Sequence, residues 1–125
     1  MVQDRAGQTA TSYDWADIEV DHPIDLAARQ RIMAERMMIS RLVLEAGFHA
    51  APHTHHNEQI SIVLEGTLRY AIGTVGSDEF REETLVAGQT MSIPPFVPHG
   101  ATALERAVVL DLFSPPSEKT GVDQS

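Results

Sequence analysis

Cysteine is absent from this 125-residue chain, so it can form no disulfide bond and no metal ion can be held by a thiolate. Any metal ion would therefore be bound by nitrogen and oxygen ligands. Basic residues are also scarce, because 9 Lys and Arg stand against 18 Asp and Glu and give a formal net charge of -9. A nucleic-acid partner needs a basic surface that replaces the counterions of the phosphates, so we expect none.

Long hydrophobic runs are missing too. The longest apolar stretch is far shorter than the roughly 20 residues that a membrane-spanning helix needs, and the first segment, MVQDRAGQTATS, is polar. We therefore expect a cytoplasmic protein that does not bind membranes. The length is that of a single domain, which can bury a sizeable core.

Short segments rich in Val, Ile and Leu are separated by 7 prolines and 8 glycines. This pattern is typical of many short strands in a sandwich or a barrel, and it predicts an all-β fold. The predicted strands are AARQRIMAER, MMISRLVLEAG, the histidine-containing segment described next, TLRYAIG, FREETLVAG and ATALERAVVLDLF.

Residues 47–66, GFHAAPHTHHNEQISIVLEG, contain four of the six histidines. In an extended strand, side chains alternate between two faces, so His53 and His55 would point the same way and could share one metal ion. If the strand continues without a bulge, Gln59 joins that face and Glu58 points away from it. Imidazole is the commonest metal ligand in proteins, and the alternative is a set of surface or hydrogen-bonded histidines.

A third imidazole follows a proline-rich loop, IPPFVPHG. Pro94, Pro95 and Pro98 restrict the backbone of this loop, which ends at His99 at the start of a predicted strand. Such a loop could hold His99 at a preset distance from the histidines of residues 47–66.

Asp111 is the single charged residue of the segment AVVLDLF. A carboxylate buried among apolar groups is costly unless it has a partner or a task. By strand alternation it shares a face with Val109 and Phe113, and if that face lines a cavity, Asp111 is the best candidate for a general acid or base. The alternative is an Asp on an exposed strand edge.

Each of the remaining candidate site residues could instead have a purely structural role. Tyr70 could also transfer protons, or could simply pack in the core. Phe96 and Phe113 are core residues or, alternatively, a wall of the substrate site. Arg41 and Arg69 could bind an anionic substrate, whereas the usual role of an arginine on a half-buried strand is a salt bridge.

The first of two separated motifs resembles that of the cupin family, G-x5-HxH-x3/4-E-x6-G. Gly47, His53, His55 and Gly66 stand in register with it, and Gln59 occupies the glutamate position.

The second motif resembles G-x5-PxGxxH-x3-N of the same family. Gly88, Pro94 and His99 match it, while Phe96 replaces its glycine and Ala103 its asparagine. The resemblance to the family covers roughly residues 37 to 113.

The resemblance implies a cupin double-stranded β-helix, or jelly-roll barrel, over residues 13–117, between a flexible N-terminal arm at 1–12 and a flexible tail at 118–125. It also implies one divalent transition metal per chain, such as Zn, Ni, Mn or Fe, inside the barrel. The implied ligands are His53, His55, Gln59 and His99, with Glu58 as the oxygen ligand instead if a bulge turns it inward. Small cupins commonly dimerise, so we expect a homodimer.

A narrower resemblance concerns the segments HNEQ and LDLFSP. They are similar to cupins related to the pectin-degradation protein that opens unsaturated uronates into linear keto acids. In that group an Asp and a Phe of the last strand, here Asp111 and Phe113, lie over the metal, whereas Ser117 stands at about the place of an arginine that binds the substrate carboxylate.

This resemblance implies a metal-dependent isomerase or lyase acting on a small oxygenated metabolite such as a sugar acid. The metal would act as a Lewis acid and Asp111 as acid or base. An Fe(II) dioxygenase with three histidines and a non-catalytic cupin that binds a small ligand or a metal are the alternatives.

Overall fold

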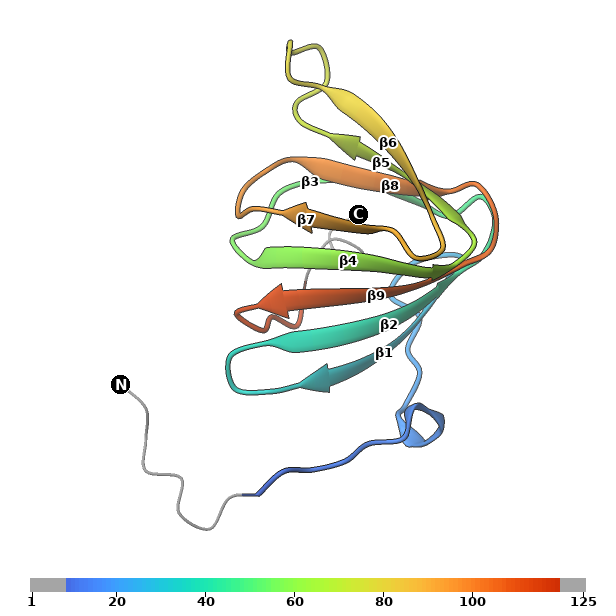
Figure 1. The fold of residues 1–125 in the computed structure, drawn as a ribbon, viewed down its shortest axis with the longest axis vertical. Coiled ribbons are helices and arrows are strands. Elements are labelled where there is room, and N and C mark those ends of the chain that lie inside the picture. Colours follow the sequence, from blue (N-terminus) through green and yellow to red (C-terminus); the bar gives the residue numbers. More distant parts are fainter. Residues whose placement is uncertain (1–8, 120–125) are drawn as a thin grey trace.

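The computed structural model of the chain describes residues 9–119, which form two antiparallel β-sheets that face each other (Figure 1). The five-stranded sheet has the order β1-β2-β9-β4-β7, and the four-stranded sheet has the order β3-β8-β5-β6. The elements are η1 (Trp15–Asp17), β1 (Ala27–Met33), β2 (Met38–Leu44), β3 (His49–His53), β4 (Glu58–Glu65), β5 (Thr67–Ile72), β6 (Arg81–Val86), β7 (Thr90–Ile93), β8 (His99–Ala103) and β9 (Ala107–Ser114). The predicted all-β fold is confirmed.

The core lies between the two sheets because apolar and polar side chains alternate along the strands. In β2, Met38, Ser40, Leu42 and Leu44 are buried, and the residues between them are only half-buried. The core cluster is built from such inward positions and from Phe48, which is 1% exposed.

Strand register aligns three polar residues in one row across the five-stranded sheet. Ser40 of β2 lies opposite Asp111 of β9, and Asp111 lies opposite Ser61 of β4. All three are buried on the inner face of this sheet. The row therefore brings polar groups from distant parts of the chain together inside an otherwise apolar interior.

Two glycines are required by close approaches of the backbone. Gly66 has a φ of +83°, and a Cβ at this position would lie 2.0 Å from the carbonyl oxygen of Arg106. A Cβ on Gly100 would lie 2.7 Å from the carbonyl oxygen of Ala50. Only glycine at position 100 lets β3 pack this closely on β8, and this pairing sets His53 opposite His99.

The expectation of one continuous strand through His53, His55 and Gln59 is wrong. β3 ends at His53, β4 begins at Glu58, and the ladder between β3 and β8 shifts register between Ala50 and His53. His55 therefore lies in the connecting loop. This loop is held from elsewhere in the fold, since the buried Asn57 donates a hydrogen bond through Nδ2 to the carbonyl oxygen of Pro115 at 2.5 Å.

The strand predicted over ATALERAVVLDLF is two strands, β8 and β9, which are joined by a turn at residues 104–106. The remaining predicted strands agree with β1, β2, β5 and β6, and β7 was not predicted. The flexible arm predicted for residues 1–12 and the tail predicted for 118–125 lie largely outside the described residues. The helix in residues 9–119 is too short and too polar to cross a bilayer.

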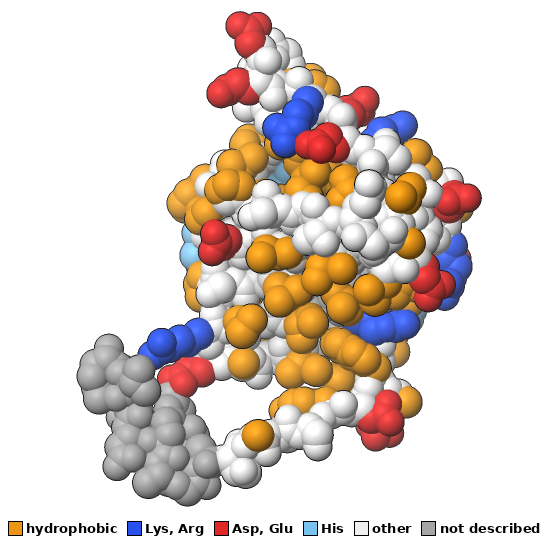
Figure 2. Space-filling view, in the orientation of Figure 1, with side chains coloured by type: hydrophobic (Ala, Val, Ile, Leu, Met, Phe, Trp, Pro, Cys, Tyr) orange, Lys and Arg blue, Asp and Glu red, His pale blue; other side chains and the backbone are white. Residues whose placement is uncertain are grey.

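Apolar side chains also gather on the outer face of the five-stranded sheet (Figure 2). Within β4, Ile60 and Leu64 point outward and are 41% and 44% exposed, so this strand is buried on its inner side alone. The half-buried outward residues of β2 and β9 in the same sheet are Ile39, Val43, Leu110 and Leu112. We call this surface the outer apolar face.

Candidate metal centre

Three imidazoles meet at one end of the space between the sheets. His53 ends β3, His55 lies in the following loop and His99 begins β8. One nitrogen of each ring lies within 4.8 Å of the others, and the ring centroids are 4.4 Å apart for His53 and His99 and 4.9 Å apart for His55 and His99. The two motifs therefore bring their histidines together as the sequence analysis expected.

The second nitrogen of each ring is held by a nearby backbone carbonyl. The pairs are His53 Nδ1 with the Ala51 oxygen at 2.8 Å, His55 Nδ1 with the Asn57 oxygen at 3.1 Å and His99 Nδ1 with the Val97 oxygen at 2.9 Å. Because a carbonyl oxygen can only accept, each Nδ1 carries the proton and each Nε2 of a neutral ring keeps its lone pair. Such partners orient histidines for metal binding.

Two features of the Nε2 atoms show that these side chains suit a bound cation. His53 Nε2 is buried and has no hydrogen-bond partner among the residues that the structure describes. His55 Nε2 lies 3.1 Å from Gln59 Oε1, and both atoms are acceptors when His55 Nδ1 and the Gln59 amide nitrogen donate elsewhere. A cation between two such acceptors would satisfy both of them.

Burial keeps two of the rings neutral. It lowers the pKa of His53, and it lowers the pKa of His99 to about 4, although the carbonyl of Val97 and, for His53, that of Ala51 act in the opposite direction. The neighbouring imidazoles lower both pKa values further. The unprotonated form is the one that binds metal ions, so the rings are ready to act as ligands at neutral pH.

A hydrogen-bonded cluster of oxygens borders the same space. Ser61 Oγ donates to Asp111 Oδ1 at 2.5 Å and is also bonded to the hydroxyl of Tyr70, which reaches it from β5 of the opposite sheet. Since the single Ser61 proton is directed to Asp111, Tyr70 is the donor in the second bond. Gln59 is a further hydrogen-bond partner of Asp111. Gln59 therefore contacts both the imidazole of His55 and the carboxylate of Asp111.

The environment alters the acidity of both ends of this cluster. Burial raises the pKa of Asp111 to about 6, against the opposing effect of the hydrogen bonds from Ser61 and Gln59. Burial, followed by the negative charge of Asp111, raises the pKa of Tyr70. Asp111 can therefore exist in either protonation state near neutral pH, while Tyr70 stays protonated.

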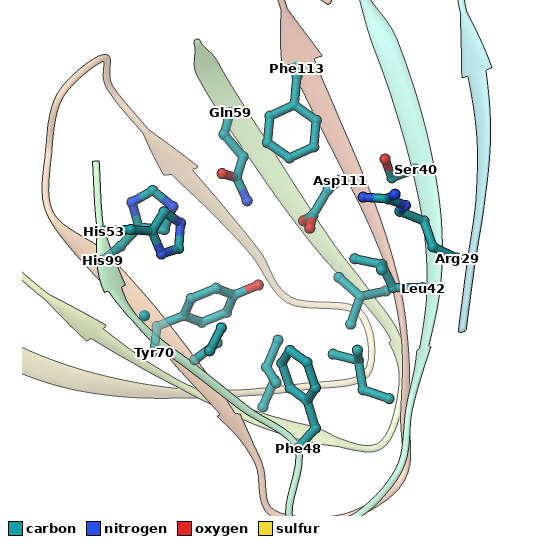
Figure 3. A pocket seen from close by; sticks show the side chains of 16 residues that line it. Arg29, Ser40, Leu42, Phe48, His53, Gln59, Tyr70, His99, Asp111 and Phe113 are labelled. Atoms are coloured by element: carbon teal, nitrogen blue, oxygen red, sulfur yellow. The ribbon is translucent and has the colours of Figure 1, made fainter. Parts of the chain in front are cut away.

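A mostly apolar cavity connects the imidazoles to Asp111 (Figure 3). Its polar lining comes from His53, His99, Gln59, Tyr70, Asp111, Arg29 and Ser40, and its apolar lining includes Leu42, Phe48, Leu68, Val109 and Phe113. The Phe113 ring lies 5.7 Å from that of His55, between centroids, with the planes 76° apart. Of the residues predicted for a site, Asp111, Tyr70 and Phe113 border the cavity with His53, Gln59 and His99.

Three residues expected at the substrate site lie elsewhere in the fold. Arg41 lies between the inward Ser40 and Leu42 in β2, so it points outward, where its Nη1 donates to Gln30 Oε1 at 3.4 Å. Arg69 likewise points outward, 3.8 Å from Glu82. These side chains would have to leave their positions to reach a ligand in the cavity.

The third of these residues, Phe96, is 66% exposed, contrary to the expectation of a core or cavity-wall residue. It stands where the cupin motif has glycine and adopts the left-handed backbone conformation that favours glycine, with a φ of +65°. Its backbone N–H donates to the His55 carbonyl at 2.9 Å, so it joins the two histidine-bearing loops. Glu58, the alternative oxygen ligand, is exposed, and the inward position belongs to Gln59.

Sequence reasoning named neither Arg29 nor Ser40 as a site residue, and it placed Ser61 on the interior face of its strand without giving it a role. Arg29 and Ser40 border the cavity, and Ser61 orients Asp111. The alternation of β2, in which Ser40 shares a face with Met38 and Leu42, could have revealed Ser40. Arg29 is apparent only once β1 is paired with β2, because this pairing places it beside Leu42.

Comparison with known proteins agrees with this architecture. Residues 40–113 match the family described as the cupin domain. No curated protein matches the chain.

Among solved structures, an RmlC-like cupin from Shewanella frigidimarina is 25% identical, with a TM-score of 0.77, and the alignment covers 89% of this chain and 96% of that one. KdgF from a Halomonas species is 24% identical, with a TM-score of 0.78 and coverages of 88% and 97%. An oxalate decarboxylase from Lactobacillus farciminis is 15% identical, with a TM-score of 0.75, and the chain covers 35% of its length. Because the family match extends over more than half of its residues, the chain belongs to the cupin family.

Proposed function

We propose that this cupin is a metal-dependent isomerase or lyase that acts on a small oxygenated metabolite such as a sugar acid. The observation that carries the proposal is the position of Asp111. Its buried carboxylate borders the same cavity as His53 and His99 and is held by a second side chain, Ser61. A metal centre and a proton-transfer group thus face one space.

The proposed ligands are His53, His55, His99 and Gln59, which offer three imidazole nitrogens and one amide oxygen. Their fit to a cation rests on the unpartnered Nε2 of His53 and on the two acceptors that face each other at His55 and Gln59. A divalent transition metal held there would supply Lewis-acid polarisation of a carbonyl or hydroxyl oxygen of the substrate.

Asp111 would move a proton at the substrate atom next to the polarised oxygen. Its oxygen Oδ1 receives the Ser61 hydrogen bond, which fixes the orientation of the carboxylate. Tyr70 completes the cluster by donating to Ser61. Phe113 and the apolar lining would keep bulk water away from the reacting group.

The experiment is a turnover screen of sugar acids and other small hydroxy and keto acids with protein of known metal content. We expect turnover without oxygen, its loss with a chelator, and its loss in Asp111→Asn with the metal content unchanged. Loss of metal in Asp111→Asn would make Asp111 a structural residue and would contradict the proposal.

The same screen separates the alternatives. Oxygen consumption with bound iron would identify an Fe(II) dioxygenase, for which three neutral imidazoles are also a suitable ligand set. Tight metabolite binding without turnover under any of these conditions would identify a non-catalytic binding protein.

The homodimer stays a prediction, and the outer apolar face is the surface on which we expect a second copy to pack. Burying such a face removes apolar area from water, which is the main driving force of stable association. Sedimentation equilibrium measures the mass. A parent protein that is monomeric at micromolar concentration would contradict the prediction, and Ile60→Lys should shift a dimer toward monomer.

A further inference from the structure

Ser40 is a buried hydroxyl group that the fold leaves without a partner. The residue is 2% exposed, and within residues 9–119 its Oγ makes no hydrogen bond. The same side chain borders the cavity that contains the imidazoles and Asp111. A hydroxyl in this position costs free energy unless a bound molecule satisfies it, so it points to a ligand.

A buried cation borders the same part of the cavity. The Arg29 side chain is 5% exposed, and its Nε and Nη2 donate to the Asp21 carboxylate at 3.0 and 2.6 Å. These two bonds fix the plane of the guanidinium. Figure 3 shows its head next to Ser40 and Asp111, on the opposite side of the cavity from His53 and His99.

Strand pairing places these groups beside the proposed proton-transfer residue. Ser40 lies directly opposite Asp111 in the ladder between β2 and β9, and Arg29 lies opposite Leu42, one inward position farther along β2. The order across the cavity is therefore imidazoles, then Gln59 and Asp111, then Ser40 and Arg29. A small molecule that spans the cavity would meet all three groups in that order.

We propose that Ser40 and Arg29 form a subsite for the carboxylate of a small 2-hydroxy or 2-keto acid. Guanidinium and hydroxyl groups are donors suited to a carboxylate, and a fixed guanidinium loses little freedom on binding. With the carboxylate in this subsite and the 2-oxygen directed to the imidazoles, the carbon atoms between them lie beside Asp111. The inference rests on the proposed function for the role of the 2-oxygen, whereas the carboxylate subsite itself needs no metal.

A purely structural role for these residues makes a different prediction. Arg29 could serve only to join β1 to Asp21, but this role does not account for the buried hydroxyl of Ser40. Because Oγ of Ser40 is unpartnered, Ser40→Ala should unfold at the same temperature as the parent or at a higher one. A structural hydroxyl would instead lower the unfolding temperature when it is removed.

The first experiment titrates acetate into the metal-free protein and follows backbone amide resonances by NMR at constant ionic strength. Acetate carries the carboxylate alone, so it tests the subsite without the metal. We expect binding in the parent, about tenfold weaker binding in Ser40→Ala and at least tenfold weaker binding in Arg29→Lys, which keeps the charge but not the planar group. Arg69→Lys, the matched control outside the cavity, should stay within twofold of the parent.

The second experiment titrates glycolate and its neutral analogue, ethylene glycol, into zinc-loaded protein by calorimetry. We expect glycolate to bind more tightly than either acetate or ethylene glycol, and Ser40→Ala to remove most of its advantage over ethylene glycol. If acetate binding depends on Ser40 but zinc does not bind, the subsite stands and the proposed function fails.

The opposite results overturn the inference alone. Turnover of a metabolite by the metal-loaded protein, with acetate binding unchanged in Ser40→Ala, would show a working metal centre without this subsite. Equal losses of acetate affinity in Arg29→Lys and Arg69→Lys would show that acetate is attracted by positive charge in general, and would overturn the inference. A lower unfolding temperature in Ser40→Ala would show that its hydroxyl has a structural role, and would overturn it too.

Discussion

The two sides of the cavity are built in different ways. On the imidazole side, formed by His53, His55 and His99, each ring is held by a backbone carbonyl of its own loop or strand end. On the carboxylate side, formed by Ser61, Tyr70 and Asp111, side chains hold side chains across strands and between sheets. Local backbone therefore positions the proposed ligands, and sheet register positions the proposed proton-transfer group.

Gln59 is where the two sides touch. Its amide oxygen faces His55 at 3.1 Å, and its amide nitrogen is directed to Asp111. An amide can accept on one side and donate on the other, whereas a carboxylate at this position could only accept from both. Glutamine in place of the motif's glutamate thus suits a site in which the next residue inward is itself an acid.

The largest effect should come from removing one imidazole. We expect His99→Ala to lower metal affinity by about 100-fold or more, since even the loss of an orienting partner of a metal ligand costs about 10- to 100-fold. Isothermal titration calorimetry with the metal ion measures this affinity. His49→Ala is the control, because His49 is exposed and bonded to Thr102. Equal metal affinity in His99→Ala and the parent would show that the imidazole side does not bind the metal ion.

Gln59→Glu tests the contact between the two sides. The substitution keeps an oxygen for the metal but takes the amide donor away from Asp111 and sets a second acid beside it. We expect metal affinity equal to or above that of the parent and a kcat about 100-fold lower, as expected for impaired proton transfer. A kcat that rises together with metal affinity would show that the two sides work independently.

A smaller loss is expected for Tyr70→Phe, which acts on the carboxylate side alone. The Ser61 bond to Asp111 is retained, and only the hydroxyl that donates to Ser61 is lost. We expect the free energy of unfolding to fall by about 1 kcal/mol, with metal affinity unchanged. Chemical denaturation measures the first quantity, and a change in metal affinity beyond twofold would show that the cluster also supports the imidazoles.

The smallest effect concerns the ion pair of Arg29 and Asp21. The hydrogen bond from Arg29 lowers the pKa of Asp21 below its usual 3.8, so the stabilisation is complete above that pH and disappears as the pH falls through the lower, folded-state value. At pH 7 we expect Asp21→Asn to be less stable than the parent by under about 1 kcal/mol, because the Asp21 side chain is 43% exposed.

Denaturation at several pH values checks this last prediction. The difference between Asp21→Asn and the parent should shrink steadily below pH 4. A difference that stays constant down to pH 2 would mean that packing, and not charge, accounts for it.

The sequence predicted the strands and the convergence of the two motifs because both depend on local patterns. Alternation along residues 59–63 placed Gln59 on the face of the histidines, and the spacing of the motif glycines, prolines and histidines anticipated the cluster. The same alternation predicted Gln59 inside and Glu58 outside, and this holds although the strand expected to continue from His53 is interrupted by a loop.

Other features depend on contacts between distant segments, which no local pattern records. The loop that carries His55 is fixed by the bond of Asn57 to Pro115, 58 positions away in sequence. Arg29 enters the cavity through the pairing of β1 with β2. Arg41, by contrast, was a mistaken candidate that strand alternation alone could have excluded, since Ser40 and Leu42 take the inward positions on either side of it.

The carbonyl tethers of the three imidazoles set a rule for redesigning metal preference. An aspartate or cysteine in place of one of these histidines would offer a good donor atom. It has no second nitrogen to donate to the backbone carbonyl, so the orientation of its donor atom would not be fixed. The side chain of Gln59 is held by His55 and Asp111, so exchanging it would alter the preference for one ion over another without releasing an imidazole from its carbonyl.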